Sequence, residues 1–506
     1  MKSRFRALWL LSGTVVFLIL AAGCNDTLRQ FIVHVPAPSG NPQTLSHAIT
    51  LSTNPVPSSD GSTMHIDVSG DSSAGIVEMG PNPVFLGKAG ARAFVINQGD
   101  ATTPPTVSVY TALLPQSAVV STVTLPAASL GPIAGTTSSA GNIYIANSGS
   151  NTVDVISGNV LAVTATIPVG SHPVMIAGNA SNNKIFVVNQ GSNDLTEIST
   201  IDNTVVKTIP VGSQPIWAVM SADGLFVFVV NQGDGTVTVI DASLDIVLPC
   251  DTNTPSCLPN KSIKVGTTPS PSPNFAFYEP NLRRVYVSNA GENSVSVIKG
   301  NGFDLGSNPQ VLPAKIGDVL NLSGTPTSVT ALSDGTRAYA ALGNCPATVN
   351  HTTILGLLGN AANCTGNLVS VIDAVSLRET GTIAVGPGVI SVDSSSDASR
   401  VFAVSVRDIT TIRDNVHLPN CQGANCLPAP PLPDRTFSTP AIYIIPTSTN
   451  VPLATVVDPS VVSRPLPTFH VPQQDPNCVP TLDLGFNNKV PMPCLLQTPF
   501  VVRTFP

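Results

Sequence analysis

Charged side chains are scarce in this 506-residue sequence. Asp, Glu, Lys and Arg make up 10% of the residues, against 42% hydrophobic ones, so a polar surface has to come mainly from Ser, Thr, Asn and Gly. The 23 basic residues are scattered and the formal net charge is -7. A protein that binds nucleic acid needs clustered Lys and Arg to neutralise phosphates, so we expect no nucleic-acid partner.

Motifs that hold cofactors are also missing. No Cys-x-x-Cys-His sequence is present to attach a c-type haem, and the glycines form no phosphate-binding loop. The seven histidines occur singly along the sequence, which argues against a copper or haem ligand cluster. We therefore expect no cofactor, no metal site and no set of catalytic residues.

The N-terminus has the pattern of an export signal. Lys2, Arg4 and Arg6 precede an apolar run over residues 7–20, and Ala21-Ala22-Gly23-Cys24 follows. This ending resembles the lipobox of bacterial lipoproteins, which implies that residues 1–23 are removed and that Cys24 is acylated. An ordinary signal peptide cut near Ala22 is the alternative. No other apolar run reaches the ~18 residues that span a bilayer, so we expect a lipid anchor in the cell envelope, facing the periplasm or the cell surface.

Cysteine usage agrees with export. Eight cysteines remain after Cys24, and an even number in an exported chain favours disulfides. Pairing between sequence neighbours is the simplest connectivity, and it predicts four bonds: Cys250 with Cys257, Cys345 with Cys364, Cys421 with Cys426, and Cys478 with Cys494. A metal site at Cys345, His351 and Cys364 is the alternative, but the short paired motifs of structural zinc are missing.

The middle of the sequence repeats itself at a shift of 42 residues. Residues 143–150 read IYIANSGS, residues 185–192 read IFVVNQGS, and residues 227–234 read VFVVNQGD. Alignment on the aromatic position gives seven copies, two of them degenerate: Phe94, Tyr144, Phe186, Phe228, Tyr286, Tyr339 and Phe402. A period of about 40 residues is typical of repeat architectures built from one supersecondary unit per copy.

Each repeat divides into four short segments with the period of two that marks a half-buried strand. Asn-Gln-Gly-Ser and Asp-Gly turns separate the segments. Four antiparallel strands repeated radially predict an all-β, seven-bladed β-propeller. We place it at residues 64–457, with insertions at about 243–262, 343–366 and 406–439.

The ends of the propeller are less clear from the sequence. Residues 64–79 and 441–457 each read as an outer-strand pair, although seven blades need only one of them, and we favour residues 64–79 because propellers often close with N-terminal outer strands. We expect residues 24–63 to be a tether and the Pro-rich residues 458–506 to be an irregular strap.

The central repeats resemble the YVTN-type β-propeller repeat. Phe186-Val187-Val188-Asn189 stands for the Tyr-Val-Thr-Asn strand, and Pro-Val-Gly-Ser-x-Pro recurs at residues 168–173 and 210–215. The resemblance covers about residues 64–457. It implies surface or envelope proteins with seven-bladed propellers, related by fold to lactonase-like ones, and it implies no single activity.

The loop before each innermost strand should border the axial channel. The residue before its final Pro varies among polar types, which could form a binding funnel: Asn82, His172, Gln214, Thr268 and Thr325. The recurring Asn97, Asn147, Asn189, Asn231 and Asn289 sit between strand and Gly, so we interpret them as turn formers.

These observations predict a binding or scaffolding module for an envelope protein or glycan, without catalysis, built as a monomeric ring. A lactonase-like hydrolase is the first alternative. It needs a general base and a clamp at the channel, for which His172 with Asp223 or Arg337 is the only combination the sequence suggests. A self-assembling structural component of a surface layer is the second alternative.

Overall fold

The structure is a computed structural model. It describes residues 47–53, 60–68, 71–89, 92–111, 119–179, 182–307, 310–345, 364–412, 435–457, 481–483, 489–491 and 498–505. Within these residues every element is a β-strand, and no helix is both long and apolar enough to cross a bilayer.

The strands form eight four-stranded antiparallel blades, each numbered here in chain order. Blade 1 consists of β4 (Pro83–Ala89), β5 (Arg92–Asn97), β6 (Thr106–Thr111) and β7 (Val119–Thr124). Blade 2 consists of β8 (Pro132–Thr137), β9 (Ile143–Asn147), β10 (Thr152–Ile156) and β11 (Val163–Pro168). Blade 3 consists of β12 (Pro173–Gly178), β13 (Lys184–Asn189), β14 (Asp194–Ser199) and β15 (Thr204–Pro210). Blade 4 consists of β16 (Pro215–Met220), β17 (Phe226–Asn231), β18 (Thr236–Asp241) and the short β19 (Ile246–Val247) and β20 (Ile263–Lys264), which both pair with β18.

The second half of the chain continues the ring. Blade 5 consists of β21 (Pro273–Glu279), β22 (Arg284–Asn289), β23 (Ser294–Lys299) and β24 (Lys315–Val319). Blade 6 consists of β25 (Pro326–Ala331), β26 (Arg337–Leu342), β27 (Leu368–Asp373) and β28 (Arg378–Ala384). Blade 7 consists of β29 (Val389–Ser394), β30 (Arg400–Ile412), β31 (Arg435–Pro446) and β32 (Ala454–Val457). Blade 8, the closing blade, orders β35 (Thr498–Phe505), β1 (His47–Thr53), β2 (Asp60–Asp67) and β3 (Ser72–Pro81) from inside to outside. The remaining strands, β33 (Thr481–Asp483) and β34 (Lys489–Pro491), form a separate two-stranded pair.

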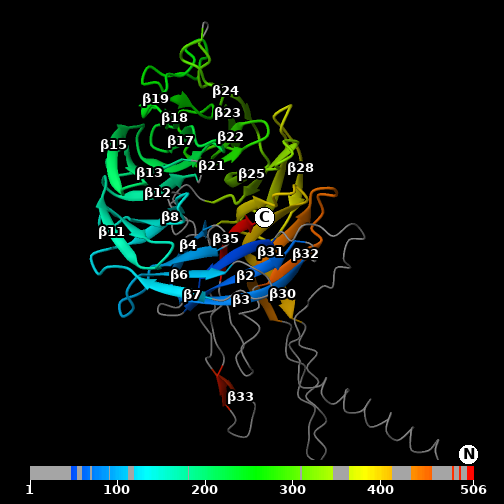
Figure 1. The fold of residues 1–506 in the computed structure, drawn as a ribbon. Coiled ribbons are helices and arrows are strands. Elements are labelled where there is room, and N and C mark those ends of the chain that lie inside the picture. The colour runs from blue at the N-terminus through cyan, green and yellow to red at the C-terminus, as the bar shows by residue number, and fades with distance from the viewer. Residues whose placement is uncertain are drawn as a thin grey trace, which may run out of the picture.

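The innermost strands line a closed ring. β4 contacts β8, and the contacts continue through β12, β16, β21, β25 and β29 to β35, which contacts β4 again. Figure 1 shows the blades in colour order around the axis, with the C-terminal β35 beside the N-terminal strands. The structure therefore confirms the all-β propeller and its four-stranded blades.

The predicted number of seven blades is wrong, because the ring has eight. Residues 64–79 and 441–457 are both used, the first in β2 and β3 of the closing blade and the second in β31 and β32 of blade 7. The inner half of the closing blade comes from β1 and β35, which pair antiparallel from His47 opposite Phe505 onward. Part of the expected tether and part of the expected strap thus belong to the ring.

The repeated aromatic residue is a core residue in every copy. All seven side chains are completely buried on the second strand of their blades. Phe94, for example, contributes to a core shared by β5 of blade 1 and β8 and β9 of blade 2, and Tyr286 to one shared by blades 5 and 6. Burial of one aromatic side chain stabilises a fold by roughly 2–3 kcal/mol, so the repeat maintains the packing between blades.

The recurring asparagines fasten the second strand to the third. Each is fully buried, and its Nδ2 donates to side-chain oxygens five and seven residues further on in four of the five copies. Asn231 donates to Thr236 Oγ1 and Thr238 Oγ1, each at 2.9 Å. Asn97 makes the same pair of bonds across a longer turn, to Thr106 and Ser108. The asparagines therefore do more than form turns, since they satisfy buried hydroxyl groups inside the blade.

A basic residue two positions before the aromatic one reaches the next blade. It contacts the hairpin between the third and fourth strands there in five copies: Arg92 to Gly158 O, Lys184 to Asp245, Arg284 to Ala374 O, Arg337 to Asn450 and Arg400 to Asp71. The last contact joins blade 7 to the closing blade as a buried two-bond ion pair. Its N–O distances are 2.8 and 3.0 Å. We call this contact the closure clasp.

Two of the four predicted disulfides are confirmed. Cys250 bonds to Cys257 in the loop between β19 and β20, and Cys345 bonds to Cys364 after β26. The alternative of a metal site is excluded for these two cysteines. The predicted pairs Cys421 with Cys426 and Cys478 with Cys494 lie outside the described residues, as does Cys24.

Candidate functional site

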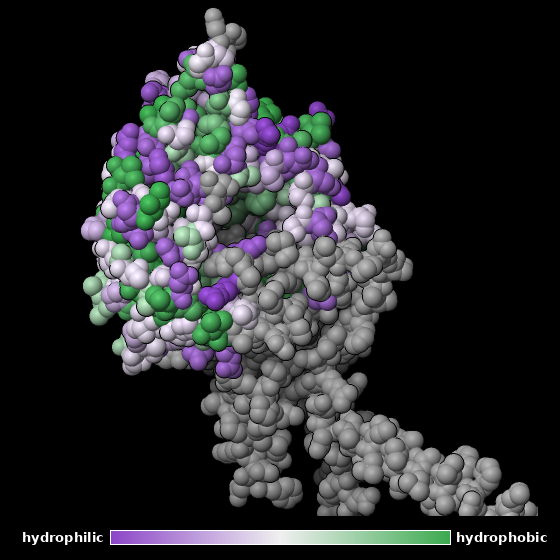
Figure 2. Space-filling model, in the orientation of Figure 1, coloured by the Kyte–Doolittle hydropathy of each residue, from purple (hydrophilic) through white to green (hydrophobic). Residues whose placement is uncertain are grey.

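The central channel contains a cavity of about 390 Å³. Its described wall comes from the innermost strands of blades 1 to 5, namely β4, β8, β12, β16 and β21, together with Phe94 of β5. Figure 2 shows the hollow at the centre of the ring, with exposed polar groups on the surrounding face. Pockets that hold small molecules typically measure roughly 300–1,000 Å³, so this cavity is large enough for an organic ligand.

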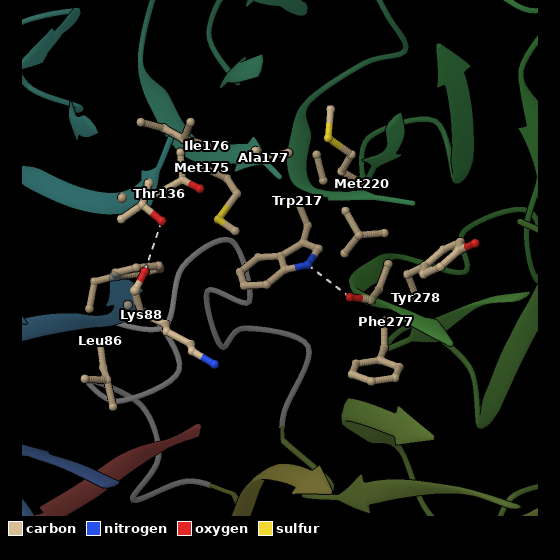
Figure 3. A pocket seen from close by; sticks show the side chains of 18 of the residues that line it. Leu86, Lys88, Thr136, Met175, Ile176, Ala177, Trp217, Met220, Phe277 and Tyr278 are labelled. Carbon is tan, nitrogen blue, oxygen red and sulfur yellow. Dashed lines mark hydrogen bonds between the residues drawn. The ribbon is translucent and has the colours of Figure 1, made fainter. Parts of the chain in front are cut away.

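The wall is apolar and rich in aromatic and thioether groups. Met175, Trp217, Phe275 and Phe277 all line the cavity and are each only partly buried, so part of each side chain faces the channel. Trp217 packs against Phe275 with ring centroids 4.7 Å apart. Its indole Nε1 donates to Ala276 O at 3.1 Å, which fixes the ring in the cavity shown in Figure 3.

Met175, Trp217 and Phe275 follow the same local feature in their innermost strands. The strand pairing shifts register within its first three residues, between Pro173 and Met175 in β12 and between Pro215 and Trp217 in β16. Such a bulge re-aims the following side chain. The equivalent position holds Phe85, Ala134 and Phe275 in blades 1, 2 and 5, but Ser328 and Ser391 in blades 6 and 7. The apolar wall is therefore confined to one side of the ring.

Two titratable groups lie in the described wall of the cavity, Lys88 and Tyr278. Burial by the surrounding protein lowers the pKa of Lys88. Burial raises the pKa of Tyr278, and the charge of Asp223 adds to this effect. Lys88 projects into the cavity from β4 in Figure 3, so the described wall combines apolar surface with one ammonium group.

Four of the five predicted channel-edge residues lie where we expected them, directly before an innermost strand. Asn82, His172 and Gln214 adopt positive φ angles of 50°, 54° and 48°. The equivalent residues of blades 2 and 7 are glycines with positive φ, Gly131 and Gly388. Asparagine and glycine tolerate this conformation best, so the backbone accounts for much of the residue choice at this position.

The same positions take part in contacts between blades. The backbone N–H of His172 donates to Asn151 Oδ1 at 2.8 Å, and that of Gln214 donates to Asn193 Oδ1 at 2.7 Å. Thr325 instead donates through its hydroxyl to Asn293 of blade 5 at 2.9 Å. The side chains of His172 and Gln214 remain exposed at the rim.

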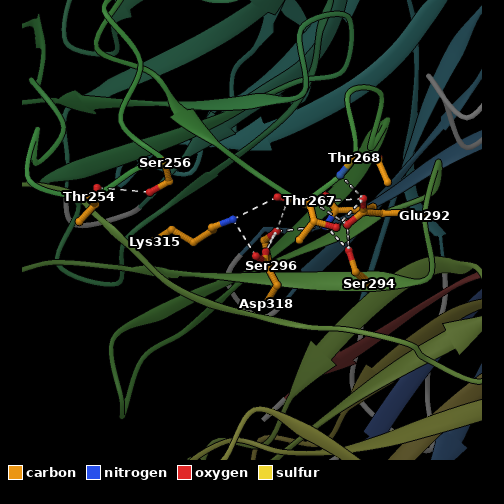
Figure 4. Close-up of polar contacts among 11 residues, drawn as sticks. Thr254, Ser256, Thr267, Thr268, Glu292, Ser294, Ser296, Lys315 and Asp318 are labelled. Carbon is orange, nitrogen blue, oxygen red and sulfur yellow. Dashed lines mark hydrogen bonds and ion pairs between the residues drawn. The ribbon is translucent and has the colours of Figure 1, made fainter.

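Thr268 does not belong to this set. The sequence has three prolines here, and β21 begins at the third, Pro273, so the equivalent residue is Ser272 with a φ of 45°. Thr268 lies in a loop held by Glu292, whose carboxylate accepts the Thr268 N–H at 2.8 Å (Figure 4). In the same view Lys315 pairs with Asp318 at 2.7 Å, and Ser296 donates to Asp318 at 2.6 Å. These contacts fix a loop rather than form a binding site.

The suggested hydrolytic residues do not come together. His172 precedes an innermost strand, whereas Asp223 follows one and Arg337 begins a second strand, so they lie at opposite ends of the blades. A six-residue strand separates these ends by roughly 20 Å. His172 Nδ1 is 3.1 Å from Ser148 Oγ, and Asp223 accepts from Ser221 Oγ and the Leu225 N–H in its own turn. Within the described residues no cluster of three metal-binding side chains is found.

The cavity residues were missed because their positions do not repeat in type. Phe, Ala, Met, Trp and Ser occupy the same place in successive blades, whereas the repeat was recognised from residues that stay the same. The signal was the second residue after the Pro that begins six of the eight innermost strands, as in Pro215 and Trp217.

No family model and no curated protein matches the chain. Among solved structures it resembles dihydro-heme d1 dehydrogenase NirN in complex with DHE, with a TM-score of 0.53, 11% identity, and coverage of 84% of this chain and 76% of that one. The fold is a β-propeller. This likeness shows the fold alone.

Two further structures share less of the geometry. The Pseudomonas aeruginosa periplasmic gluconolactonase PpgL has 15% identity and a TM-score of 0.46, over 67% of this chain and 95% of that one. Kuenenia stuttgartiensis hydrazine synthase has 17% identity and a TM-score of 0.32, over 63% of each chain. The chain thus spans just under two thirds of the hydrazine synthase chain.

Proposed function

We propose that this protein is a lipid-anchored β-propeller of the cell envelope that binds a small apolar ligand in its central channel and does not transform it. The observation that carries the proposal is the apolar, aromatic wall of the 390 Å³ cavity. Transfer of an apolar ligand from water to such a wall is favourable by roughly 25 cal/mol per Å² of buried surface.

Catalysis is disfavoured by the same wall. Hydrolysis requires a general base within hydrogen-bond reach of the reacting atom, and usually donors for the developing negative charge. Among the described residues that line the cavity there is no Asp, Glu or His. We expect purified protein to leave a panel of lactones intact, and hydrolysis that disappears in His172→Ala would support the lactonase alternative instead.

The binding site can be tested with a tryptophan reporter. The sequence has two tryptophans, and Trp9 lies in the signal segment 1–23 that export would remove, so Trp217 is the only tryptophan of the protein from residue 24 onward. Titration with N-phenyl-1-naphthylamine, an uncharged aromatic probe, should quench Trp217 emission saturably with one molecule per chain. Phe277→Glu, which places a charge in the wall, should weaken binding at least tenfold. Val160→Glu, on a surface position that is 69% exposed, should not. Equal binding by both variants would contradict the proposal.

The envelope location rests on separate observations. The two disulfides among the described residues are the form expected of an extracytoplasmic protein. For the anchor itself, the proposal rests on the signal and lipobox-like sequence that ends at Cys24. Cys24→Ser should move the protein from the membrane fraction to the soluble fraction, and unchanged fractionation would contradict lipid attachment.

The rim offers a second role, as a scaffold for an envelope protein or glycan. The exposed polar side chains of His172 and Gln214 favour it, since they differ from blade to blade on a fixed backbone. A pull-down from envelope extract compares the wild-type rim with the rim of the double variant His172→Ala/Gln214→Ala. A partner lost with this variant would support the rim, and one retained would argue against it.

A further inference from the structure

We propose that the ring rests with one face on the bilayer that holds its lipid anchor, and that exposed aliphatic side chains of that face enter the interfacial layer of the lipid. This inference rests on the proposed anchor and names the surface that meets the membrane. Three observations carry it: the uneven distribution of exposed aliphatic residues, the fixed conformation of the hairpins that hold them, and the face at which residues 24–46 join the ring.

Two kinds of hairpin share one face of the ring, which we call the hairpin face. In blades 1 to 7 the strands are antiparallel neighbours, so the connection between the first and second strands and the one between the third and fourth lie at the same end. Contacts between blades confirm this: Lys184 at the start of a second strand reaches Asp245 in a hairpin between third and fourth strands, and Asn281 Nδ2 donates to Asp334 O at 3.1 Å. The rim that carries His172 lies on the opposite face.

Exposed aliphatic side chains are concentrated on the hairpin face. Within the described residues, eight Val, Leu and Ile side chains that are at least 37% exposed lie in connections of this face. Only two, Leu130 and Leu320, lie in loops of the opposite face, and the others lie along outermost strands. Single exposed apolar residues are ordinary on protein surfaces, but scatter does not explain their gathering on one face. The eight are Val160, Ile201, Leu225, Leu244, Leu282, Val375, Val451 and Leu453.

Hydrogen bonds fix the tips of these hairpins. Asp241 Oδ1 accepts the N–H of Leu244 at 3.0 Å, and Asp373 Oδ1 accepts the N–H of Val375 at 3.1 Å. Leu244 and Val375 are nevertheless 58% and 77% exposed, so the turns hold aliphatic groups out in solvent. A surface that is ordered in advance loses less conformational entropy when it binds.

Charge does not select the partner of this face. Exposed Asp202 and Asp334 in its hairpins are accompanied by exposed Arg283 and Arg378. Charges of both signs give no strong attraction to an anionic surface, whereas insertion of aliphatic side chains depends on the apolar area that is buried. We therefore expect a bilayer of zwitterionic lipid, without anionic lipid, to be sufficient.

The N-terminal segment joins the ring at the hairpin face. β1 is the second strand of the closing blade and begins at His47, which pairs with Asp67 at the end of β2. The hairpin that follows β2 contains Asp71 of the closure clasp, so His47 lies at this face. The 23 residues 24–46 reach at most about 80 Å. A tether of this length raises the effective concentration of the hairpin face at the lipid, so a weak affinity for the bilayer is enough to seat the ring.

Quenching of tryptophan by brominated lipid tests this orientation. The acylated protein is incorporated through its anchor into phosphatidylcholine vesicles that contain dibrominated phosphatidylcholine. Val375→Trp places a reporter on the hairpin face, Leu320→Trp places a matched one on the opposite face, and wild type gives the background from Trp217. We expect the added emission of Val375→Trp to shift to shorter wavelength and to fall roughly twofold, while that of Leu320→Trp stays unquenched. Tryptophan itself favours interfaces, and the matched variant carries the same bias.

Removal of neighbouring aliphatic side chains tests whether they seat the ring. Adding Ile201→Ser and Leu244→Ser to Val375→Trp should abolish most of the quenching, because less apolar area then enters the lipid. Both positions are well exposed, so the fold should tolerate these changes. Adding Leu130→Ser, on the opposite face, should leave the quenching unchanged. Quenching that survives the two hairpin substitutions would overturn the proposed role of these side chains.

The outcomes separate this inference from the proposed function. If the protein carries no acyl chain, the anchor proposal fails, and a hexahistidine tag before Asn25 with nickel-chelating lipid in the vesicles then tests the hairpin face alone. If the chain is tethered but Val375→Trp is quenched no more than Leu320→Trp, the hairpin face does not meet the bilayer and the anchor stands. Light scattering without vesicles tests the other occupant. A dimer that Ile201→Ser/Leu244→Ser dissociates would assign the face to a second copy of this chain and overturn the inference.

Discussion

The closure clasp provides the sharpest test of how the ring is held together. Asp71 in the hairpin between β2 and β3 binds Arg400 at the start of β30, 329 residues later in the chain. Their side chains are 1% and 10% exposed. The perturbation is Asp71→Asn, because asparagine tolerates the φ of 48° at this position and so removes charge without adding backbone strain.

The magnitude follows from the two bonds of the clasp. The amide of the Asp71→Asn variant would keep one acceptor for Arg400 and lose the second, charge-assisted bond, which leaves a largely buried guanidinium with an uncharged partner. Removing one partner of a buried pair costs about 3–5 kcal/mol, and the retained acceptor places the expected cost at the low end, about 3 kcal/mol. This cost falls on the opening of the closing blade first, since Asp71 belongs to that blade and its partner Arg400 to blade 7.

Native-state hydrogen exchange measures that opening locally. Protection of the amides in β2 and β3 should fall by roughly 100-fold in Asp71→Asn, while protection in β13 and β17 of blades 3 and 4 stays nearly constant. Asp202→Asn is the matched control, because Asp202 lies in the corresponding hairpin of blade 3 but is exposed and bonds to Thr204. If protection of the β2 and β3 amides falls less than threefold in Asp71→Asn, the clasp does not close the ring. An equal loss of protection at these amides in Asp202→Asn would lead to the same conclusion.

Three further predictions concern the repeat and its loops. Gly212→Ala should destabilise the fold by about 1–3 kcal/mol in denaturant unfolding, because the new Cβ would lie 2.5 Å from Asn231 Nδ2, whereas Gly381→Ala, which has nothing within 4 Å, should change stability by less than about 0.5 kcal/mol. Burial opposes ionisation of Glu292, but hydrogen bonds from Ser294 and Thr268 outweigh this effect and lower its pKa. Wild type should therefore be more stable than Glu292→Gln by its full margin above about pH 5, and this margin should fade as the pH falls through the lowered pKa of Glu292. A difference independent of pH would contradict this. Peptide mapping without reduction should find Cys345 joined to Cys364, and a mixture of partners would contradict the described pairing.

The sequence predicts the blades well wherever the repeat is local. Four strands, a buried aromatic residue such as Phe186 and a turn after Asn189 all follow from alternation and turn residues within about 40 positions, and the structure contains each of them. The pairing of Cys250 with Cys257 succeeds for the same reason, since the partners are separated by only seven positions.

The sequence-based predictions fail where a contact joins segments far apart in the chain, or where a copy departs from the repeat. The eighth blade joins β1 to β35. Neither strand has the aromatic residue followed by Asn that marks the other blades, so the local sequence does not predict their pairing. The basic residues two positions before five of the seven aromatics, Arg92 for instance, recur visibly in the sequence, yet their partners lie in the next blade. Thr268 was misplaced because three closely spaced prolines offer three possible strand starts.

The central claim is that the channel beside Trp217 is the ligand-binding site. Fluorine NMR of the protein from residue 24 onward, labelled with 5-fluorotryptophan, reports on that position alone, because Trp217 is the only tryptophan once residues 1–23 are removed. We predict one resonance that shifts on addition of N-phenyl-1-naphthylamine and stops shifting at one equivalent. An unshifted resonance in a sample that binds the probe would place the binding site elsewhere and contradict the account.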